Sequence, residues 1–128
     1  LLLITLCRVT GIPAHFQSGL YTTPYDIGCH DWAMFYVEPY GWLFADPSFG
    51  GSAFRANRKE LHDFYFGNLD PFRMVANNDV CNEFEPAKKY LRSDPYDNQI
   101  GEIEYDDYGL IEKDFSYKHV ILENHQNN

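Results

Sequence analysis

Residues 29–48 read Cys29-His-Asp-Trp-Ala-Met-Phe-Tyr-Val-Glu-Pro-Tyr-Gly-Trp-Leu-Phe-Ala-Asp-Pro-Ser48, and this pattern predicts a β-hairpin. The side chains at 30–38 alternate, and their aromatic and β-branched content suits a pleated surface that is packed on at least one face. Pro-Tyr-Gly at 39–41 predicts the turn. The returning strand at 42–45 ends before Pro47, because proline cannot donate to a sheet ladder.

The hairpin brings His30 and Asp46 to the same end of the predicted sheet, because antiparallel strands place the start of one beside the end of the next. Both positions are even, so any register that pairs even with even residues puts both side chains on one face. A register centred on residue 38 sets the two opposite each other, whereas pairing Glu38 with Trp42 offsets them. The sequence does not decide between these two registers, and a β-bulge would shift either of them.

A histidine beside a carboxylate has a chemical use. The carboxylate accepts the imidazole N–H, fixes the tautomer and orients the other ring nitrogen, so His30 and Asp46 would form two members of a nucleophile–base–orienter triad. On these two residues alone, an ordinary polar pair at the rim of the hairpin is the competing interpretation.

The composition favours a single packed domain over residues 1–128. The length suffices for one core, and an aromatic content of 17% argues against disorder. A net charge of −9 disfavours nucleic acid and anionic membrane surfaces as partners. No apolar run reaches the roughly 18 residues that a membrane-spanning helix needs.

Residues 1–10 are apolar almost all round, which predicts a buried helix that ends at Gly11 and Pro13. The chain starts with neither Met nor a basic segment, so this stretch is not a signal peptide. We interpret the chain as the C-terminal fragment of a domain whose N-terminal part is missing. The sequence therefore assigns no compartment.

The remaining elements predict an α+β class, with the buried helix packed on an antiparallel sheet. A capping box from Asn57 to Glu60 predicts the second helix. The predicted segments are a strand at 14–21, a flexible turn at 49–52, a helix at 58–65, a strand at 72–76, a helical turn at 86–91, strands at 101–105 and 117–122, and a polar tail at 123–128.

Four motifs together resemble the transglutaminase-like superfamily over residues 1 to about 50. They are Leu6-Cys-Arg-Val-Thr-Gly-Ile-Pro-Ala14, Ser18-Gly19, His30-Asp-Trp32 and Gly41-Trp-Leu-Phe-Ala-Asp-Pro-Ser48. Phe66-Gly-Asn-Leu-Asp-Pro-Phe-Arg73 with Asn77, and Gly101-Glu-Ile-Glu104, resemble the C-terminal part of bacterial members more weakly. Arg73 and Asn77 lie four apart on a predicted strand and so share a face, and we expect no role for them beyond packing or polar bonding.

The resemblance implies a papain-like fold and a Cys-His-Asp triad, with His30 as the base, Asp46 as the orienter and Trp32 as a wall of the substrate site. A packed core position is the competing interpretation for Trp32. The family's nucleophile falls upstream of Leu1, at the N-terminus of the helix, where the dipole and amide groups favour a thiolate.

None of the three cysteines of this chain matches the family's nucleophile. Cys7 lies near the apolar C-terminal end of the predicted helix and is predicted to be a core residue. Cys29 is predicted to point away from His30, because adjacent strand residues face opposite ways. Cys81 matches no motif.

The expected function is a cysteine-dependent acyl transfer to water or to an amine, with a protein or peptide as substrate and without a cofactor. The fragment itself is expected to be inactive. The acidic run at 102–107 lacks the glycine and the ligand spacing of a calcium loop, so no metal is expected. The alternative is a non-catalytic module that binds a peptide or a glycan. The oligomeric state stays open.

Overall fold

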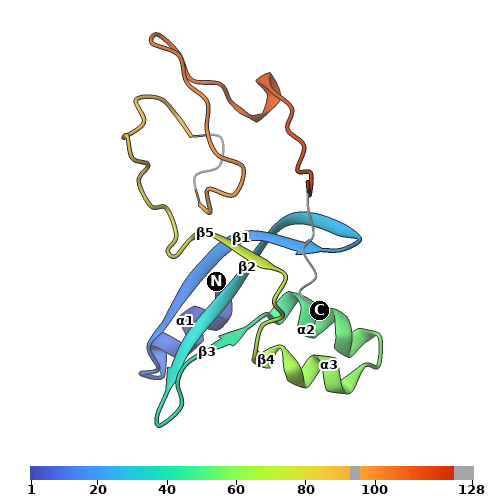
Figure 1. Ribbon diagram of the computed structural model, residues 1–128. Helices are drawn as coiled ribbons and strands as arrows, with labels where there is room; N and C mark the ends of the chain where they lie inside the picture. The colour runs from blue at the N-terminus through green and yellow to red at the C-terminus, as the bar shows by residue number, and fades with distance from the viewer. Residues whose placement is uncertain (93–95, 123–128) are drawn as a thin grey trace.

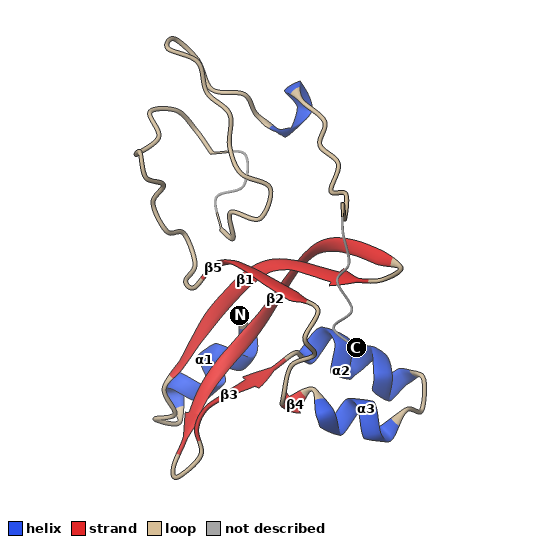
Figure 2. Ribbon diagram, in the orientation of Figure 1, coloured by secondary structure: helices blue, strands red, loops and turns tan. Residues whose placement is uncertain are grey.

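The computed structural model describes residues 1–92 and 96–122, and it has the predicted α+β class (Figures 1 and 2). In this part of the chain, three α-helices accompany a sheet of five antiparallel strands: the first helix packs on the sheet, and the other two form a pair beside it. The elements in order are α1 Leu2–Val9, β1 Ala14–Thr23, β2 Asp26–Val37, β3 Gly41–Ala45, α2 Pro47–Arg55, α3 Lys59–Phe64, β4 Phe66–Gly67, β5 Arg73–Asn77 and a 3-10 turn at Glu112–Asp114.

The sheet is built around the long β1–β2 hairpin, and its strand order is β4-β3-β2-β1-β5. The strand β5 therefore joins the edge beside β1, on the far side of the sheet from β3 and β4. Figure 2 shows β5 lying along β1 after the chain has passed through the α2–α3 pair. This topology brings residues 73–77 next to the middle of β1.

The β2–β3 register is centred on residue 39, between the two registers that the sequence left open. It pairs Val37 with Gly41 and Met34 with Phe44, so even residues face even residues. Gly41 has a φ of +83°, in the left-handed region that favours glycine, and the Tyr40 N–H donates to the Val37 carbonyl at 2.8 Å. This turn chemistry selects the intermediate register.

The core lies between α1 and one face of the sheet. Its buried members are Ile4, Ala14, Phe16, Ala33, Phe35 and Ala45. In α1 only Ile4 is buried, whereas Leu2, Leu6 and Val9 are exposed. The helix packs on the sheet as predicted, but full burial was wrong, because the sheet contacts only one stripe of a helix that is apolar on every side.

The predicted flexible turn at 49–52 is wrong, because these residues form the middle of α2. Pro47 occupies the first turn, and Asp46 caps the helix by accepting a hydrogen bond from the Phe49 N–H at 2.9 Å. A proline at the start and an aspartate cap both favour a helix. They outweigh Gly50 and Gly51, which cost about 1 kcal/mol each in a helix interior.

The predicted strand at 14–21, helix at 58–65 and strand at 72–76 are confirmed as β1, α3 and β5. The strands predicted at 101–105 and 117–122, and the helical turn at 86–91, are wrong. Residues 101–105 make one isolated bridge, between Glu104 and Gly109, because the chain turns back on itself at Tyr105. The predicted tail at 123–128 lies outside the described residues.

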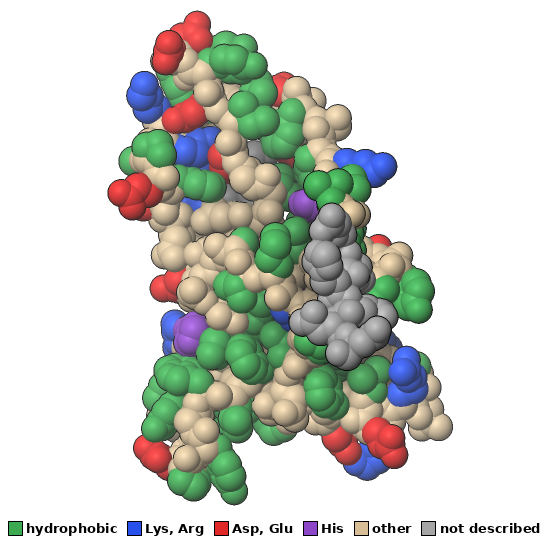
Figure 3. Space-filling model, viewed as in Figure 1, with side chains coloured by type: hydrophobic (Ala, Val, Ile, Leu, Met, Phe, Trp, Pro, Cys, Tyr) green, Lys and Arg blue, Asp and Glu red, His purple; other side chains and the backbone are tan. Residues whose placement is uncertain are grey.

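No helix in the described ranges is long and apolar enough to cross a bilayer. The face of the molecule in Figure 3 carries hydrophobic side chains over much of its middle, and most of the acidic side chains that it shows stand out toward its two ends.

Candidate functional site

His30 and Asp46 meet on the face of the sheet that points away from α1. Nε2 of His30 lies 2.7 Å from Oδ2 of Asp46. The side chain of Asp46 is 0% exposed and that of His30 is 13% exposed. The pair that the sequence predicted is therefore in hydrogen-bond contact, and the edge of the imidazole still reaches solvent.

Asp46 is held in place from several directions. Its Oδ1 accepts the hydrogen bond from the Phe49 N–H, and its own backbone N–H donates to the Tyr65 carbonyl at 2.9 Å. Because the same side chain caps α2 and contacts His30, the position of the helix and the position of the carboxylate are fixed together.

The geometry determines which imidazole nitrogen can act as a base. A carboxylate accepts hydrogen bonds but does not donate them, so Nε2 of His30 carries the proton that lies between the two side chains. Nδ1 then has the free lone pair. This nitrogen can take a proton from a thiol and later return it to a leaving group.

Aromatic rings enclose the imidazole. The ring of Phe49 lies 4.5 Å from that of His30, and the ring of Tyr21 meets it edge-on at 6.1 Å. The Tyr21 hydroxyl donates to Asp26 at 2.8 Å, and this hydrogen bond raises the pKa of Tyr21. These rings limit the access of water and fix the imidazole orientation.

Trp32 shares the His30 face but is 2% exposed. Its indole N–H donates to Oε1 of Gln17 at 2.6 Å. A side chain that is buried to this extent supports the site by packing beneath it. Contact between Trp32 and a substrate stays a prediction.

From the sequence, Arg73 has no role beyond packing or polar bonding, whereas the structure places its guanidinium at the site. Nη2 of Arg73 lies 3.1 Å from Oδ2 of Asp46 and donates to Oδ2 of Asp70 at 2.7 Å. The Arg73 side chain is 4% exposed. The short Asp70-Pro-Phe-Arg73 segment was the sequence signal, but only the β1–β5 pairing shows that it reaches His30 and Asp46.

The charges around Arg73 shift several pKa values. Burial alone would raise the pKa of Asp70, but the hydrogen bonds from Arg73 and Tyr65 lower it below its usual value. Burial would lower the pKa of Arg73, yet Asp70 and Asp46 raise it overall. Burial and the hydrogen bond to Asp70 together raise the pKa of Tyr65.

Cys7 and Cys29 lie as the sequence predicted, and neither faces His30. Cys7 packs against the core on α1, on the other side of the sheet from His30. Cys29 pairs with Leu20 in the β1–β2 ladder and so faces away from His30. Cys81 is exposed in the segment after β5.

The start of α1 reaches the end of the sheet that carries the His30–Asp46 pair. Leu1, Leu2 and Leu3 line a hollow of about 390 Å³ together with Asp31, Trp32, Pro47 and Ser48. The backbone that enters α1 therefore lies close to the residues that flank His30 and Asp46 in the sequence.

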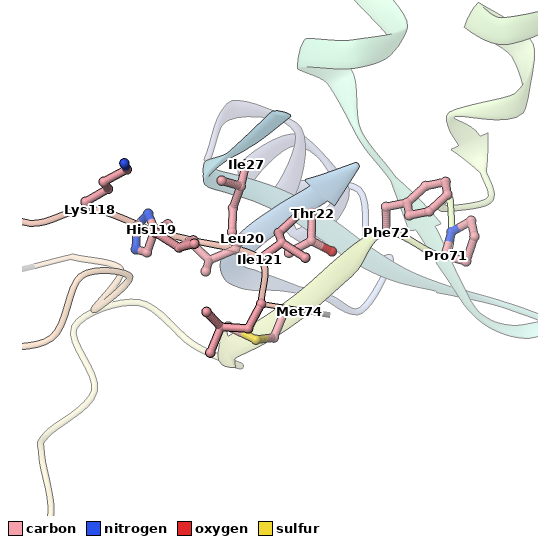
Figure 4. Close-up of a pocket in the computed structure, with 11 residues that line it drawn as sticks. Leu20, Thr22, Ile27, Pro71, Phe72, Met74, Lys118, His119 and Ile121 are labelled. Atoms are coloured by element: carbon pink, nitrogen blue, oxygen red, sulfur yellow. The ribbon is translucent and has the colours of Figure 1, made fainter. Parts of the chain in front are cut away.

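A second hollow, of about 780 Å³, lies on the opposite face of the sheet from His30 (Figure 4). Leu20, Ile27 and Met74 line it from the strands, and residues 118–122 lie across from them. It is separate from the His30 site. In the ranges that the structure covers, no three His, Cys, Asp or Glu side chains are placed to hold a metal ion.

The fold and the site define an α+β protein with a buried carboxylate–imidazole pair on an antiparallel sheet. Residues 1–47 match the family model described as the transglutaminase-like superfamily, which confirms the predicted resemblance over these residues. The arrangement of helices and sheet is consistent with a transglutaminase-like core. No curated protein and no solved structure matches the chain.

Proposed function

We propose that this chain is part of a cysteine-dependent acyl-transfer domain in which His30 is the general base and Asp46 its orienting carboxylate. The observation that supports this most is the 2.7 Å contact between His30 and a fully buried Asp46. His30 begins the third of the four motifs that resemble the transglutaminase-like superfamily, and Asp46 lies in the fourth.

In the proposed reaction, a thiol on a residue that precedes Leu1 gives its proton to Nδ1 of His30 and attacks the carbonyl of an amide. The imidazolium then gives that proton to the leaving amine, and an acyl-enzyme thioester remains. Water or a second amine attacks the thioester and loses its proton to His30, which releases an acid or a new amide. The proposed substrate is a protein or peptide, and the reaction needs no cofactor.

The position of α1 bears on how the thiol would reach His30. The helix packs on the face away from His30, so the nucleophile would approach around the end of the sheet. The hollow lined by Leu1, Pro47 and Ser48 lies at that end. Residues that continue from the start of α1 would therefore arrive beside the His30–Asp46 pair.

The alternative function is a non-catalytic module of the same fold that binds a peptide or a glycan. The observation that favours it is the position of Cys7 and Cys29, which both face away from His30. The two functions differ in one testable respect. Only the enzyme needs an imidazole that exchanges a proton with a thiol.

The test uses the protein with the residues that precede Leu1 and measures the release of ammonia from a glutamine-containing peptide, with and without an added primary amine. We expect turnover that His30→Gln reduces by a factor of about 10² or more, since general base catalysis contributes about 10²–10⁴-fold. The matched control is His15→Gln, because His15 lies on the same face beside Trp42 and not beside Asp46.

Turnover that survives in His30→Gln would contradict the proposal. A protein that binds the peptide without turnover would instead support the binding module. The 128-residue chain alone is expected to give no turnover.

A further inference from the structure

Four ionisable side chains form a chain of contacts, in the order His30, Asp46, Arg73 and Asp70. Oδ2 of Asp46 lies 2.7 Å from Nε2 of His30 and 3.1 Å from Nη2 of Arg73. The same Nη2 donates to Asp70 at 2.7 Å, and Nε of Arg73 donates to Asp70 at 3.1 Å. One carboxylate oxygen is thus shared by an imidazole and a guanidinium.

The guanidinium has little freedom to leave this position. It lies 4.4 Å from the ring centre of Phe49, 5.6 Å from that of Trp32 and 5.9 Å from that of Tyr65. Aromatic faces attract a cation at such distances. Nη1 is buried and has no hydrogen-bond partner among the described residues.

A buried ion pair is weak evidence for a purely stabilising role, because apolar residues of similar volume often stabilise a protein as well. The contacts of Arg73 point to another role. Its Nη2 contacts the oxygen of Asp46 that also accepts the hydrogen bond of His30, and the ring of Phe49 packs on both the imidazole and the guanidinium.

We propose that Arg73 is a positioning residue for the His30–Asp46 pair, which holds the shared oxygen of Asp46 and balances its charge. The catalytic value of this role rests on the proposed function. The electrostatic coupling between Arg73 and His30 does not, since it requires only the four side chains that the structure brings together.

The coupling has a direction that packing alone would not produce. A buried carboxylate with no other cation beside it favours the imidazolium form of His30. Arg73 offsets part of that negative charge and so favours the neutral imidazole, which is the form that can act as a base. Asp70 in turn offsets part of the charge of Arg73.

The other ionisable groups near His30 stay the same in the test. Tyr21 of β1 meets its ring edge-on and is bonded to Asp26 of β2, while Phe49 of α2 is uncharged. The hydroxyl of Tyr65 donates to Asp70 at 2.9 Å. Substitutions at 70 and 73 therefore change the charge on one side of the imidazole only.

The experiment is an NMR titration of the His30 imidazole in the 128-residue chain and in the variants Arg73→Gln, Asp70→Asn and Arg73→Lys. Arg55→Gln is the matched control, because it removes the same charge from an exposed position on α2. Circular dichroism establishes that each variant is folded.

We expect Arg73→Gln to move the titration midpoint of His30 up by at least about half a pH unit, and Asp70→Asn to move it down, as neighbouring charges do at these distances. Arg73→Lys should give a smaller change than Arg73→Gln. A folded Arg73→Gln variant that titrates like Arg55→Gln would overturn the proposal, and so would shifts in the same direction for Arg73→Gln and Asp70→Asn.

If Arg73→Gln does not fold, Asp70→Asn decides the question. A downward shift of the His30 midpoint supports the coupling, whereas an unchanged or higher midpoint overturns it. Because the titration needs no nucleophile, failure of the acyl-transfer assay together with the expected shifts would refute the proposed function alone. Turnover together with unchanged titration would refute the role of Arg73 alone.

Discussion

His30 and Asp46 are diagonal neighbours and not direct partners in the β2–β3 ladder, yet their side chains meet at 2.7 Å. The last pair of the ladder is Ala33 with Ala45. Extending that register by one residue sets Trp32 beside Asp46, so His30 reaches the carboxylate along the diagonal. Diagonal positions on one face lie within reach of aromatic and long side chains.

Asp46→Asn separates the chemical role of Asp46 from its role as a helix cap. Asparagine also caps helices well, so α2 should stay folded. The amide accepts the imidazole proton less well than a carboxylate does and does not stabilise the imidazolium. Turnover of the longer protein should therefore fall by about 10²-fold or more.

Asp46→Ala is the comparison variant for Asp46→Asn. It also removes the cap, which costs about 1 kcal/mol, and it leaves Arg73 without one of its two carboxylate partners. Urea unfolding should show a larger loss of stability for alanine than for asparagine. If both variants lost the same free energy of unfolding, the Asp46 cap would contribute little to stability.

Gly19→Ala should detach β5 from the sheet. A Cβ at this position would lie 1.9 Å from the Met74 carbonyl oxygen, a backbone atom that cannot move away alone. The β1–β5 register shifts between Ser18 and Gly19, where the two backbones come close. We expect a marked drop in the melting temperature, together with loss of the coupling between Arg73 and His30.

Gly51→Ala is the matched control, because among the described residues its Cβ would meet only the end of the flexible Arg55 side chain, at 3.5 Å. This change in α2 should leave stability unchanged or raise it by about 0.5–1 kcal/mol. If Gly19→Ala were as well tolerated as Gly51→Ala, the close approach of β5 to β1 would be wrong.

Trp32→Phe should affect stability more than substrate binding. The change removes the hydrogen bond to Gln17 and leaves a buried amide oxygen unpaired, which costs about 1–3 kcal/mol. Trp42→Phe, at a half-exposed position, should cost less. A large rise in KM without a loss of stability in Trp32→Phe would instead show that Trp32 contacts the substrate, as the sequence motif predicts.

Acid should weaken the fold partly through Asp70. The pKa of Asp70 is lower in the folded protein than its ordinary value of 3.8, so the stability that this carboxylate contributes is present above that value. It is lost as the pH falls through the lower, folded-state pKa. We would measure the free energy of unfolding by urea between about pH 6 and 2.5. The difference in this free energy between the unmodified chain and Asp70→Asn should become smaller as the pH falls.

Asp63→Asn serves as the control for this pH dependence. Asp63 also has a lowered pKa, caused mainly by its hydrogen bond from Lys59, but the pair is exposed on α3. Exposed pairs contribute little to stability. If Asp63→Asn lowered the free energy of unfolding as much as Asp70→Asn does, the buried Arg73–Asp70 contact would not be the source of the pH dependence.

The sequence predicted the features of the site that depend on local periodicity. Positions 30 and 46 are both even, so their side chains lie on one face in every hairpin register that pairs even residues with even residues. The same alternation predicted that Cys29 faces away from His30. The turn at Gly41 then fixed the register, and that detail depends on backbone geometry that the residues left open.

Arg73 shows what the sequence could not reveal. Its place beside Asp46 depends on β5 pairing with β1, a contact between segments that are far apart in the chain, and on a glycine at position 19 that permits it. The α2 helix was not predicted because Gly50 and Gly51 were interpreted as a turn, although Asp46 and Pro47 before them favour the start of a helix. The strand predicted at 101–105 failed because the chain turns back on itself there and makes one bridge, between Glu104 and Gly109, instead of joining the sheet.

The central claim is that His30, oriented by Asp46, exchanges a proton with a cysteine thiol. The most direct measurement is the rate of iodoacetamide labelling at each cysteine between about pH 5 and 9, mapped by mass spectrometry in the protein with its upstream residues and in its His30→Ala variant. We predict that one cysteine before Leu1 labels fast at low pH and slows in the variant, as a thiolate–imidazolium pair requires. If every cysteine titrates like an ordinary thiol, near pH 8.5, and is indifferent to His30, the claim is contradicted.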